Sequence, residues 1–254
     1  MHRAVAIIPA RLGSTRFPRK ALADRTGRAL VLHVADAAAR AGSVARVVVA
    51  TDGQEILAAA QRSGVEAVLT GEHPNGTSRL NEAAQRLNLP DDAVIVNVQG
   101  DEPEIDPAII DAAVHALGAH DMATVASPIP AGSAEFHDPN VVKVVLRTDG
   151  GALYFSRAPI PLDRDGDAPA SARPLRHVGL YVYRRAFLRL YASLAPTPLE
   201  QAEKLEQLRA LEHGRTIAVA VRESSHAGID TPEQYEAFVR RWAAREASAP
   251  RSQL

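Results

Sequence analysis

The chain has 254 residues, of which 46 % are apolar and only 4 % aromatic, and its formal net charge at pH 7 is −1. This length allows one large α/β domain or two small ones. The balanced charge gives no reason to expect a nucleic acid or a membrane as partner, and the absence of cysteine excludes disulfides, thiolate catalysis and Cys-ligated metals. No apolar run approaches the roughly 20 residues of a transmembrane helix, and no signal peptide is recognisable. The sequence therefore predicts a soluble, cytoplasmic protein.

Apolar runs alternate with segments of helical periodicity in the first half of the chain. The predicted strands cover residues 5–9, 46–50, 65–69 and 93–98. The predicted helices cover residues 30–38, 56–62 and 78–87. Strands that alternate with helices imply βαβ units, so we expect an α/β fold with a mostly parallel sheet.

The second half of the chain is less regular. Patterns typical of strands cover residues 141–146, 180–183 and 216–221. Two capping boxes, beginning at Thr197 and Thr231, predict one long helix ending near Glu212 and a last helix. A single domain over residues 1–246 with a disordered tail over 247–254 is the simplest account of the whole chain.

A basic segment, residues 9–20, follows the first predicted strand. Open α/β sheets bind ligands at the edge where such strands end, and residues 13–15 can turn backbone N–H groups toward an anion. The segment adds four cations, Arg11, Arg16, Arg19 and Lys20. It matches neither the P-loop nor the G-x-G-x-x-G pattern. It suits a triphosphate, although from its charge alone it could also be a solvated turn.

A polar segment, residues 99–103, follows the strand that ends near residue 98. Gly100 permits a tight bend there, and Asp101 would lie at the same sheet edge as the basic segment. A carboxylate that faces phosphates requires a cation between them, which Mg²⁺ supplies. Asp106 is the better cap for the helix that begins at Pro107, so Asp101 is available for the metal.

Asp230 precedes the last predicted helix, which Thr231 can cap without it. An acidic residue is also favourable beside a helix N-terminus, so the local pattern leaves metal binding and a structural role equally open. Arg157 could clamp a substrate carboxylate, whereas an isolated His177 on a strand is more often structural. H-E-x-x-H and G-x-S-x-G are absent, which gives no support for a zinc site or a serine hydrolase.

These motifs, in this order, closely resemble the CMP-Kdo synthetase (3-deoxy-manno-octulosonate cytidylyltransferase) family from residue 4 to about 238. The segments that carry the resemblance are residues 8–20, 96–103, 140–145, 152–161, 176–181, 205–209 and 228–232. The resemblance implies a Rossmann-like nucleotidyltransferase fold whose sheet is flanked by helices. It also implies a homodimer, with a smaller inserted subregion, about residues 135–215, that contributes sugar binding and dimer contacts.

The resemblance also implies roles for individual residues. It places CTP on Ala10, Arg11, Ser14, Lys20, Gly76, Thr77, Arg79 and Gly100, with the base read by the loop around Gly76. It places Mg²⁺ on Asp101 and Asp230, which with Lys20 and Arg11 would be the catalytic residues. It places an acidic 2-keto sugar on Gln99, Arg157, His177, Tyr181, Glu206 and Gln207.

Four positions depart from the family pattern. Asn75 and Ser78 stand where Ser and an acidic residue are usual, Arg19 replaces a small or neutral residue, and Leu162 replaces a common Trp. These departures leave open a related acid as substrate: an 8-amino Kdo analogue, another ulosonic acid or a phosphonate. A non-catalytic nucleotide-binding protein would not require both aspartates, and a metal-dependent glycosyltransferase would usually carry a D-x-D motif that is absent here.

Overall fold

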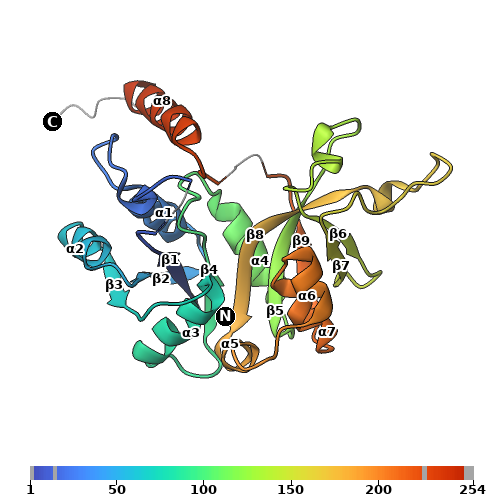
Figure 1. Ribbon diagram of the computed structural model, residues 1–254, viewed down its shortest axis with the longest axis horizontal. Coiled ribbons are helices and arrows are strands. Elements are labelled where there is room, and N and C mark those ends of the chain that lie inside the picture. Colours follow the sequence, from blue (N-terminus) through green and yellow to red (C-terminus); the bar gives the residue numbers. More distant parts are fainter. Residues whose placement is uncertain (1–2, 14–15, 225–227, 249–254) are drawn as a thin grey trace.

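The computed structural model describes residues 3–13, 16–224 and 228–248. The described residues form one nine-stranded sheet, in which seven strands follow the order β3-β2-β1-β4-β8-β5-β9 and β6 and β7 form a side branch beside β8 (Figure 1). The strands are β1 Ala4–Ala10, β2 Val44–Thr51, β3 Glu66–Leu69, β4 Val94–Asn97, β5 Met122–Pro128, β6 Lys143–Leu146, β7 Ala152–Ser156, β8 Leu175–Arg184 and β9 Ile217–Val221.

Within the seven-strand path, six strands run in one direction and only β8 is antiparallel to its neighbours β4 and β5. The α-helices are α1 Leu30–Ala39, α2 Gln54–Arg62, α3 Gly76–Arg86, α4 Pro107–Leu117, α5 Arg185–Tyr191, α6 Pro198–Glu203, α7 Gln207–Glu212 and α8 Pro232–Ser248. The expected Rossmann-like arrangement, a mostly parallel sheet flanked by helices, is therefore confirmed.

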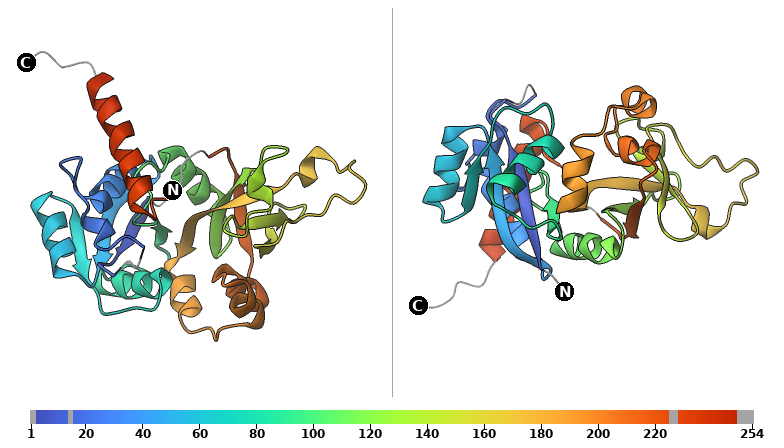
Figure 2. Two further views of the ribbon diagram at one scale, coloured as in Figure 1. Left: turned by 45° about the horizontal axis from the view of Figure 1, so that its top comes forward. Right: turned by 90° about the horizontal axis from the view of Figure 1, so that it is seen from below.

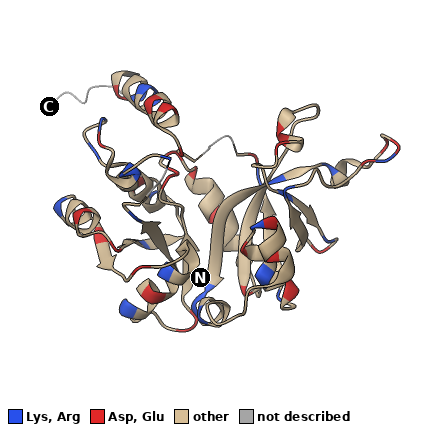
Figure 3. Ribbon diagram, in the orientation of Figure 1, with Lys and Arg blue, Asp and Glu red and all other residues tan. Residues whose placement is uncertain are grey.

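Both faces of the sheet are covered by helices. One core cluster joins α1, α2 and α4 to one face of the sheet, through residues such as Val34 and Ile110. A second cluster joins α3, α5 and α7 to the other face, through residues such as Leu80 and Leu208. Burial on both faces explains why the central strands are continuous apolar runs without alternation. Charged residues accordingly lie on the helices and loops, and the central strands carry few of them (Figure 3).

The last helix, α8, lies apart from the sheet beside the N-terminal half of the molecule (Figure 2). Tyr235 and Phe238 pack with Leu30 and Ile229 in a small separate cluster. The helix extends through Ser248, two residues beyond the predicted domain end, and the rest of the predicted tail lies outside the described residues. None of the helices described has both the length and the hydropathy of a membrane span.

The sequence patterns missed β5, β7 and α5, and they merged α6 with α7. β5 consists largely of small and hydroxyl-bearing residues, and it is buried because β8 and β9 pair with it on either side. The predicted helix 197–212 breaks at Lys204, which adopts a left-handed conformation with φ 55°. No glycine or proline marks that break, so periodicity alone could not locate it.

Candidate active site

A cavity of about 350 Å³ opens at the carboxyl edge of the sheet, where β1 and β4 end and α3 begins. Parallel strands bring their carboxyl ends to one edge, which is the usual ligand site of such sheets. Nine of the residues predicted from the sequence line it: Ala10, Arg11, Lys20, Gly76, Arg79, Gln99, Gly100, Asp101 and Asp230. Ser14, the other predicted phosphate contact, lies outside the described residues.

Lys20 is the point on which the two aspartates converge. Its Nζ lies 2.8 Å from Asp101 Oδ2 and 3.2 Å from Asp230 Oδ1. The same ammonium donates a hydrogen bond to Ile229 O at 2.6 Å. Arg16 adds a second cation, with Nη2 3.0 Å from Asp230 Oδ1. Two carboxylates distant in the sequence thus lie within reach of a single positive charge.

The backbone around Asp101 is held too closely to allow a side chain at position 100. A Cβ on Gly100 would lie 2.7 Å from Pro9 O, a backbone atom that cannot give way cheaply. On the other side, Ile229 N–H donates to Asp101 O at 2.8 Å. The loop after β4 is therefore fixed to β1 and to the segment before α8, and these contacts bring the two aspartates together.

The neighbouring helix caps use other residues, as the sequence predicts. Asp106 accepts a hydrogen bond from Ala108 N at 2.9 Å and caps α4. Thr231 Oγ1 accepts from Gln234 N at 3.3 Å, and Gln234 Oε1 accepts from Thr231 N at 3.0 Å, which completes a capping box. The carboxylates of Asp101 and Asp230 are thus directed to the cavity and not to a helix end.

These two aspartates fit a hard divalent cation. Carboxylate oxygens are preferred ligands of Mg²⁺, which is commonly bound through one or two carboxylates together with phosphate oxygens. Among the described residues no cluster of three or more His, Cys, Asp or Glu could hold a metal ion. The donor set formed by Asp101 and Asp230 therefore suits an ion that takes its remaining ligands from a nucleotide and from water.

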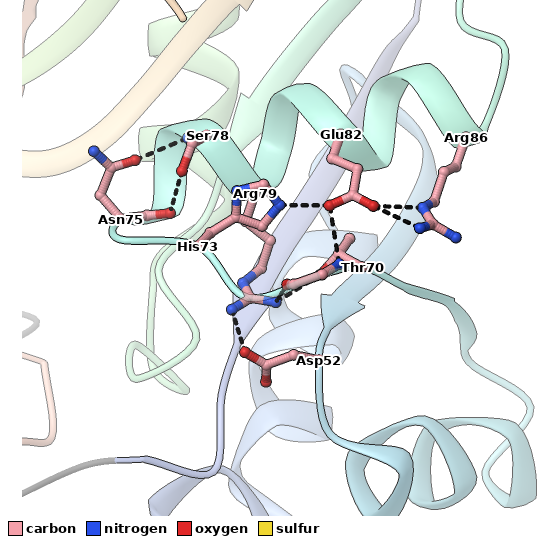
Figure 4. A network of polar contacts seen from close by, with 9 residues as sticks. Asp52, Thr70, His73, Asn75, Ser78, Arg79, Glu82 and Arg86 are labelled. Atoms are coloured by element: carbon pink, nitrogen blue, oxygen red, sulfur yellow. Dashed lines mark hydrogen bonds and ion pairs between the residues drawn. The ribbon is translucent and has the colours of Figure 1, made fainter.

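Arg79 lies at the back of the cavity in a network of polar contacts (Figure 4). Its side chain is almost fully buried, and Nη2 lies 2.6 Å from Asp52 Oδ2. Nη1 donates to Thr70 Oγ1 at 2.6 Å and to Gly71 O at 3.2 Å. Arg79 thus holds together the loops that follow β2 and β3, in addition to lining the cavity where the base was predicted.

Glu82 fixes the same loop from the next turn of α3. It accepts from His73 Nε2 at 2.5 Å and from Gly71 N at 2.9 Å, and it pairs with Arg86 at 2.6 Å. These hydrogen bonds, with that of His73 as the largest contribution, lower the pKa of Glu82 to about 2. The loop that leads to Gly76 is therefore anchored before any ligand binds.

Asn75 and Ser78 depart from the family pattern, and together they form the cap of α3. Asn75 Oδ1 accepts from Ser78 N at 2.9 Å, and Ser78 Oγ donates to Asn75 O at 3.1 Å (Figure 4). The usual Ser and acidic residue at these positions have the spacing of a capping box. The exchange therefore replaces one helix cap with another, and Asn is among the strongest caps.

The predicted sugar residues on β8, His177 and Tyr181, are half-buried, and they lie beside the cavity because β8 pairs with β4. His177 packs edge-on against Phe155, with ring centroids 5.1 Å apart, and lies 5.2 Å from Tyr181. Desolvation by these rings lowers the pKa of His177 to about 3, so the imidazole stays neutral. Thr124 Oγ1 donates to Leu180 O at 2.6 Å and lies 2.9 Å from His177 Nε2. Because the Thr124 hydroxyl donates its one proton to Leu180 O, its oxygen accepts the hydrogen bond from His177. The imidazole proton of His177 therefore lies on Nε2.

Arg157 is held firmly at the end of β7. Its Nε donates to Glu203 O at 2.8 Å, and its Nη1 donates to Pro139 O at 2.9 Å. Beside it, the ammonium of Lys143 is fully buried and donates to three carbonyl oxygens, including Arg157 O at 2.7 Å. Burial lowers the pKa of Lys143. Arg157 is therefore oriented by backbone contacts that a buried lysine stabilises.

Glu206 and Gln207 stand at the start of α7, and Glu206 contacts the loop expected to bind the nucleotide. Thr77 Oγ1 donates to Glu206 Oε2 at 3.0 Å, although the two residues lie in different halves of the chain. Burial raises the pKa of Glu206. Gln207 is 4 % exposed and its Nε2 has no partner among the described residues. Gln99 links this side to the cavity, since its Nε2 donates to Gly179 O at 3.3 Å.

Several supporting residues were not predicted from the sequence: Asp52, His73, Glu82, Thr124, Lys143 and Glu203. Of these, Asp52 could have been predicted as a site residue, because it directly follows a strand at the carboxyl edge of the sheet. Thr124 and Lys143 lie within β5 and β6. Lysine is almost never fully buried, so no local pattern indicated that Lys143 lies in the interior.

Comparison with known proteins shows which family the chain belongs to. The family model described as "Cytidylyltransferase" matches residues 5–217. The chain belongs to the cytidylyltransferase family. It is 52 % identical over 238 residues to 3-deoxy-manno-octulosonate cytidylyltransferase of Polynucleobacter necessarius subsp. necessarius (strain STIR1), an alignment that covers 91 % of this chain and 92 % of that protein.

A solved structure is also similar to this cytidylyltransferase over nearly its whole length. The structure of CMP:2-keto-3-deoxy-manno-octonic acid synthetase complexed with CTP matches with a TM-score of 0.88 and 39 % sequence identity. The match covers 96 % of this chain and 99 % of the other. The resemblance to the CMP-Kdo synthetase family that was read from the motifs is therefore confirmed.

Proposed function

We propose that this cytidylyltransferase transfers CMP from CTP to the anomeric hydroxyl of 3-deoxy-manno-octulosonate (Kdo), releasing pyrophosphate. The observation that carries the proposal is the convergence of Asp101 and Asp230 on the ammonium of Lys20, inside a cavity that Arg11 and Arg16 also line. Cations of this kind suit a triphosphate, and paired carboxylates suit a divalent metal. The relative that is 52 % identical carries the name of the same reaction.

In the proposed reaction, the sugar hydroxyl attacks the α-phosphorus of CTP directly. Such a transfer depends on positioning and charge neutralisation more than on covalent catalysis. Arg11 and Lys20 would offset the negative charge of the phosphates, and the backbone around Gly76 would orient the base. Arg157 would bind the sugar carboxylate, and the neutral imidazole of His177 would help to orient the sugar.

Asp101 and Asp230 would hold Mg²⁺, which when bound neutralises phosphate charge and favours ionisation of a nearby hydroxyl. In the structure the ammonium of Lys20 balances the charge of these carboxylates. With the metal bound to Asp101 and Asp230, Lys20 would be available to contact the phosphates.

Three further proposals concern the assembly, the substrate and the location of the protein. Leu153 and Leu162 are 62 % and 85 % exposed, and both lie in the inserted subregion, which we propose contributes to a homodimer. A related acid remains the alternative substrate, since Leu162 replaces a common Trp. We also propose a cytoplasmic location, where CTP is available.

Pyrophosphate release from CTP and Mg²⁺, measured across a panel of 2-keto acid sugars, tests the proposed function. We expect release with Kdo at a kcat/KM well above that of its analogues. Release with an analogue but not with Kdo would replace the substrate and keep the reaction. The absence of release with every acid, in a protein that binds CTP, would contradict the proposed function.

A further inference from the structure

We infer that Thr77 is a positioning residue that connects the nucleotide cavity to the sugar side by holding the carboxylate of Glu206. The inference rests on the proposed function, because it assigns Glu206 to the sugar. The family resemblance places Thr77 in the loop that binds the nucleotide. In the structure its hydroxyl instead donates to the carboxylate of Glu206, a residue predicted to bind the sugar.

The geometry of Thr77 supports this assignment. Thr77 lies in the first turn of α3 directly after Gly76, which lines the cavity. It is 7 % exposed, so its hydroxyl has little access to water. Its Oγ1 donates to Glu206 Oε2 at 3.0 Å across 129 positions of sequence. The bond is therefore a direct polar connection between the loop expected to bind CTP and the start of α7.

Glu206 is held from two directions. Tyr191 Oη donates to the backbone carbonyl of Glu206 at 2.5 Å, which fixes the main chain. Thr77 is the side-chain donor that fixes the carboxylate. A buried carboxylate that loses its donor is left without compensation for its lost hydration. A hydrogen bond to a charged group also contributes more to stability than one between neutral groups. Removal of the Thr77 hydroxyl should therefore disturb Glu206, and with it the adjacent hydroxyl of Tyr183, which also interacts with Thr77.

The connection has a consequence for binding. Because Glu82 already anchors the loop that leads to Gly76, Thr77 would hold the carboxylate of Glu206 for the acid whether or not CTP is bound. Thr77 would act on the acid through Glu206 without touching it.

Steady-state kinetics of three variants test the inference. Thr77→Val keeps the shape of the side chain and removes the hydroxyl, Thr77→Ser keeps the hydroxyl, and Thr77→Ala guards against poor packing of the valine. For Thr77→Val and Thr77→Ala we expect the KM for the acid to rise about tenfold or more, the range for a lost hydrogen bond to a charged group. The KM for CTP should change by less than about threefold, and Thr77→Ser should remain within about threefold of the wild type in both.

A double-mutant cycle with Glu206→Gln completes the test. If Thr77 acts through Glu206, Thr77→Val should add little to the effect of Glu206→Gln. Additive effects, an unchanged KM for the acid, an equal rise in the KM for CTP, or a Thr77→Ser variant as impaired as Thr77→Val would each overturn the inference. The proposed function is tested separately with the wild-type enzyme. The variants are then compared with whichever acid the wild-type enzyme turns over.

Discussion

The candidate site has two parts, a proposed nucleotide side around Lys20 and a proposed sugar side around His177 and Glu206. They differ in how their charged and polar groups are surrounded. The nucleotide side is an open cavity in which Lys20 and Arg16 face Asp101 and Asp230. The sugar side places polar groups in apolar surroundings: His177 stays neutral, and burial raises the pKa of Glu206. The difference fits the two substrates that we propose, because a triphosphate is recognised by charge, whereas a sugar is recognised by many oriented polar groups.

The largest effect should come from the charged side. Asp101→Ala removes one of the two carboxylates beside Lys20, and we expect kcat to fall by about 10²- to 10³-fold, as when one preorganised electrostatic contact is removed. Pyrophosphate release at saturating CTP and Mg²⁺ measures it.

The matched control for Asp101→Ala is Asp106→Ala in the following turn. Asp106 caps α4, so its loss should cost about 1 kcal/mol of stability and leave kcat near that of the wild type. Near-normal turnover by Asp101→Ala would show that the charged side does not perform the chemistry.

On the sugar side, stability should depend on a buried cation. Lys143→Met leaves three backbone carbonyls without their donor, so we expect a loss of about 3 kcal/mol or more in the free energy of unfolding. Urea denaturation measures this loss. Lys204→Met, at an exposed lysine, serves as control and should change stability by less than about 0.5 kcal/mol. Equal effects of the two substitutions would contradict the role of the buried ammonium.

A smaller, pH-dependent effect should appear at the anchored loop of the nucleotide side. The pKa of Glu82 in the folded protein, about 2, lies below its ordinary value of 4.5. Its contribution to stability is therefore fully present above pH 4.5 and is lost as the pH falls through 2. Glu82→Gln should be less stable than the wild type by about 1 kcal/mol at pH 7, and the gap should narrow below pH 4.5.

Thermal melts of Glu82→Gln at pH 7 and pH 3.5, compared with those of the exposed neighbour Glu72→Gln, measure that difference. A gap that stays constant with pH would mean that the folded protein does not hold Glu82 in its ionised form.

The smallest effect should come from restoring the family pattern at the cap of α3. Because Asn75 and Ser78 already cap this helix, the double variant Asn75→Ser with Ser78→Glu should shift stability by less than about 0.5 kcal/mol. The KM for CTP and the choice of acid should stay the same. A changed preference among acids would show that this loop, and not the sugar side, contributes to substrate selection.

Local sequence patterns were sufficient for much of the fold. Continuous apolar runs and helical periodicity predicted the βαβ order of the first half, because both faces of that sheet are buried and each element is long enough to show its period. They failed at β5 and at the break at Lys204. The burial of β5 depends on strands distant in the sequence, and no glycine or proline accompanies the left-handed residue.

The sequence by itself determined which residues follow the strands at the carboxyl edge. It therefore identified the basic segment and Asp101 as candidate site residues. For Asp230 the local pattern alone left two roles open, and the sequence said nothing of the bond from Thr77 to Glu206. Only the tertiary structure brings Asp230 beside Lys20 and Thr77 beside Glu206, since these pairs are 210 and 129 positions apart in the sequence. The spacing of apolar residues along the chain indicates which positions are buried. The partner of a polar side chain depends instead on how elements distant in the sequence pack together.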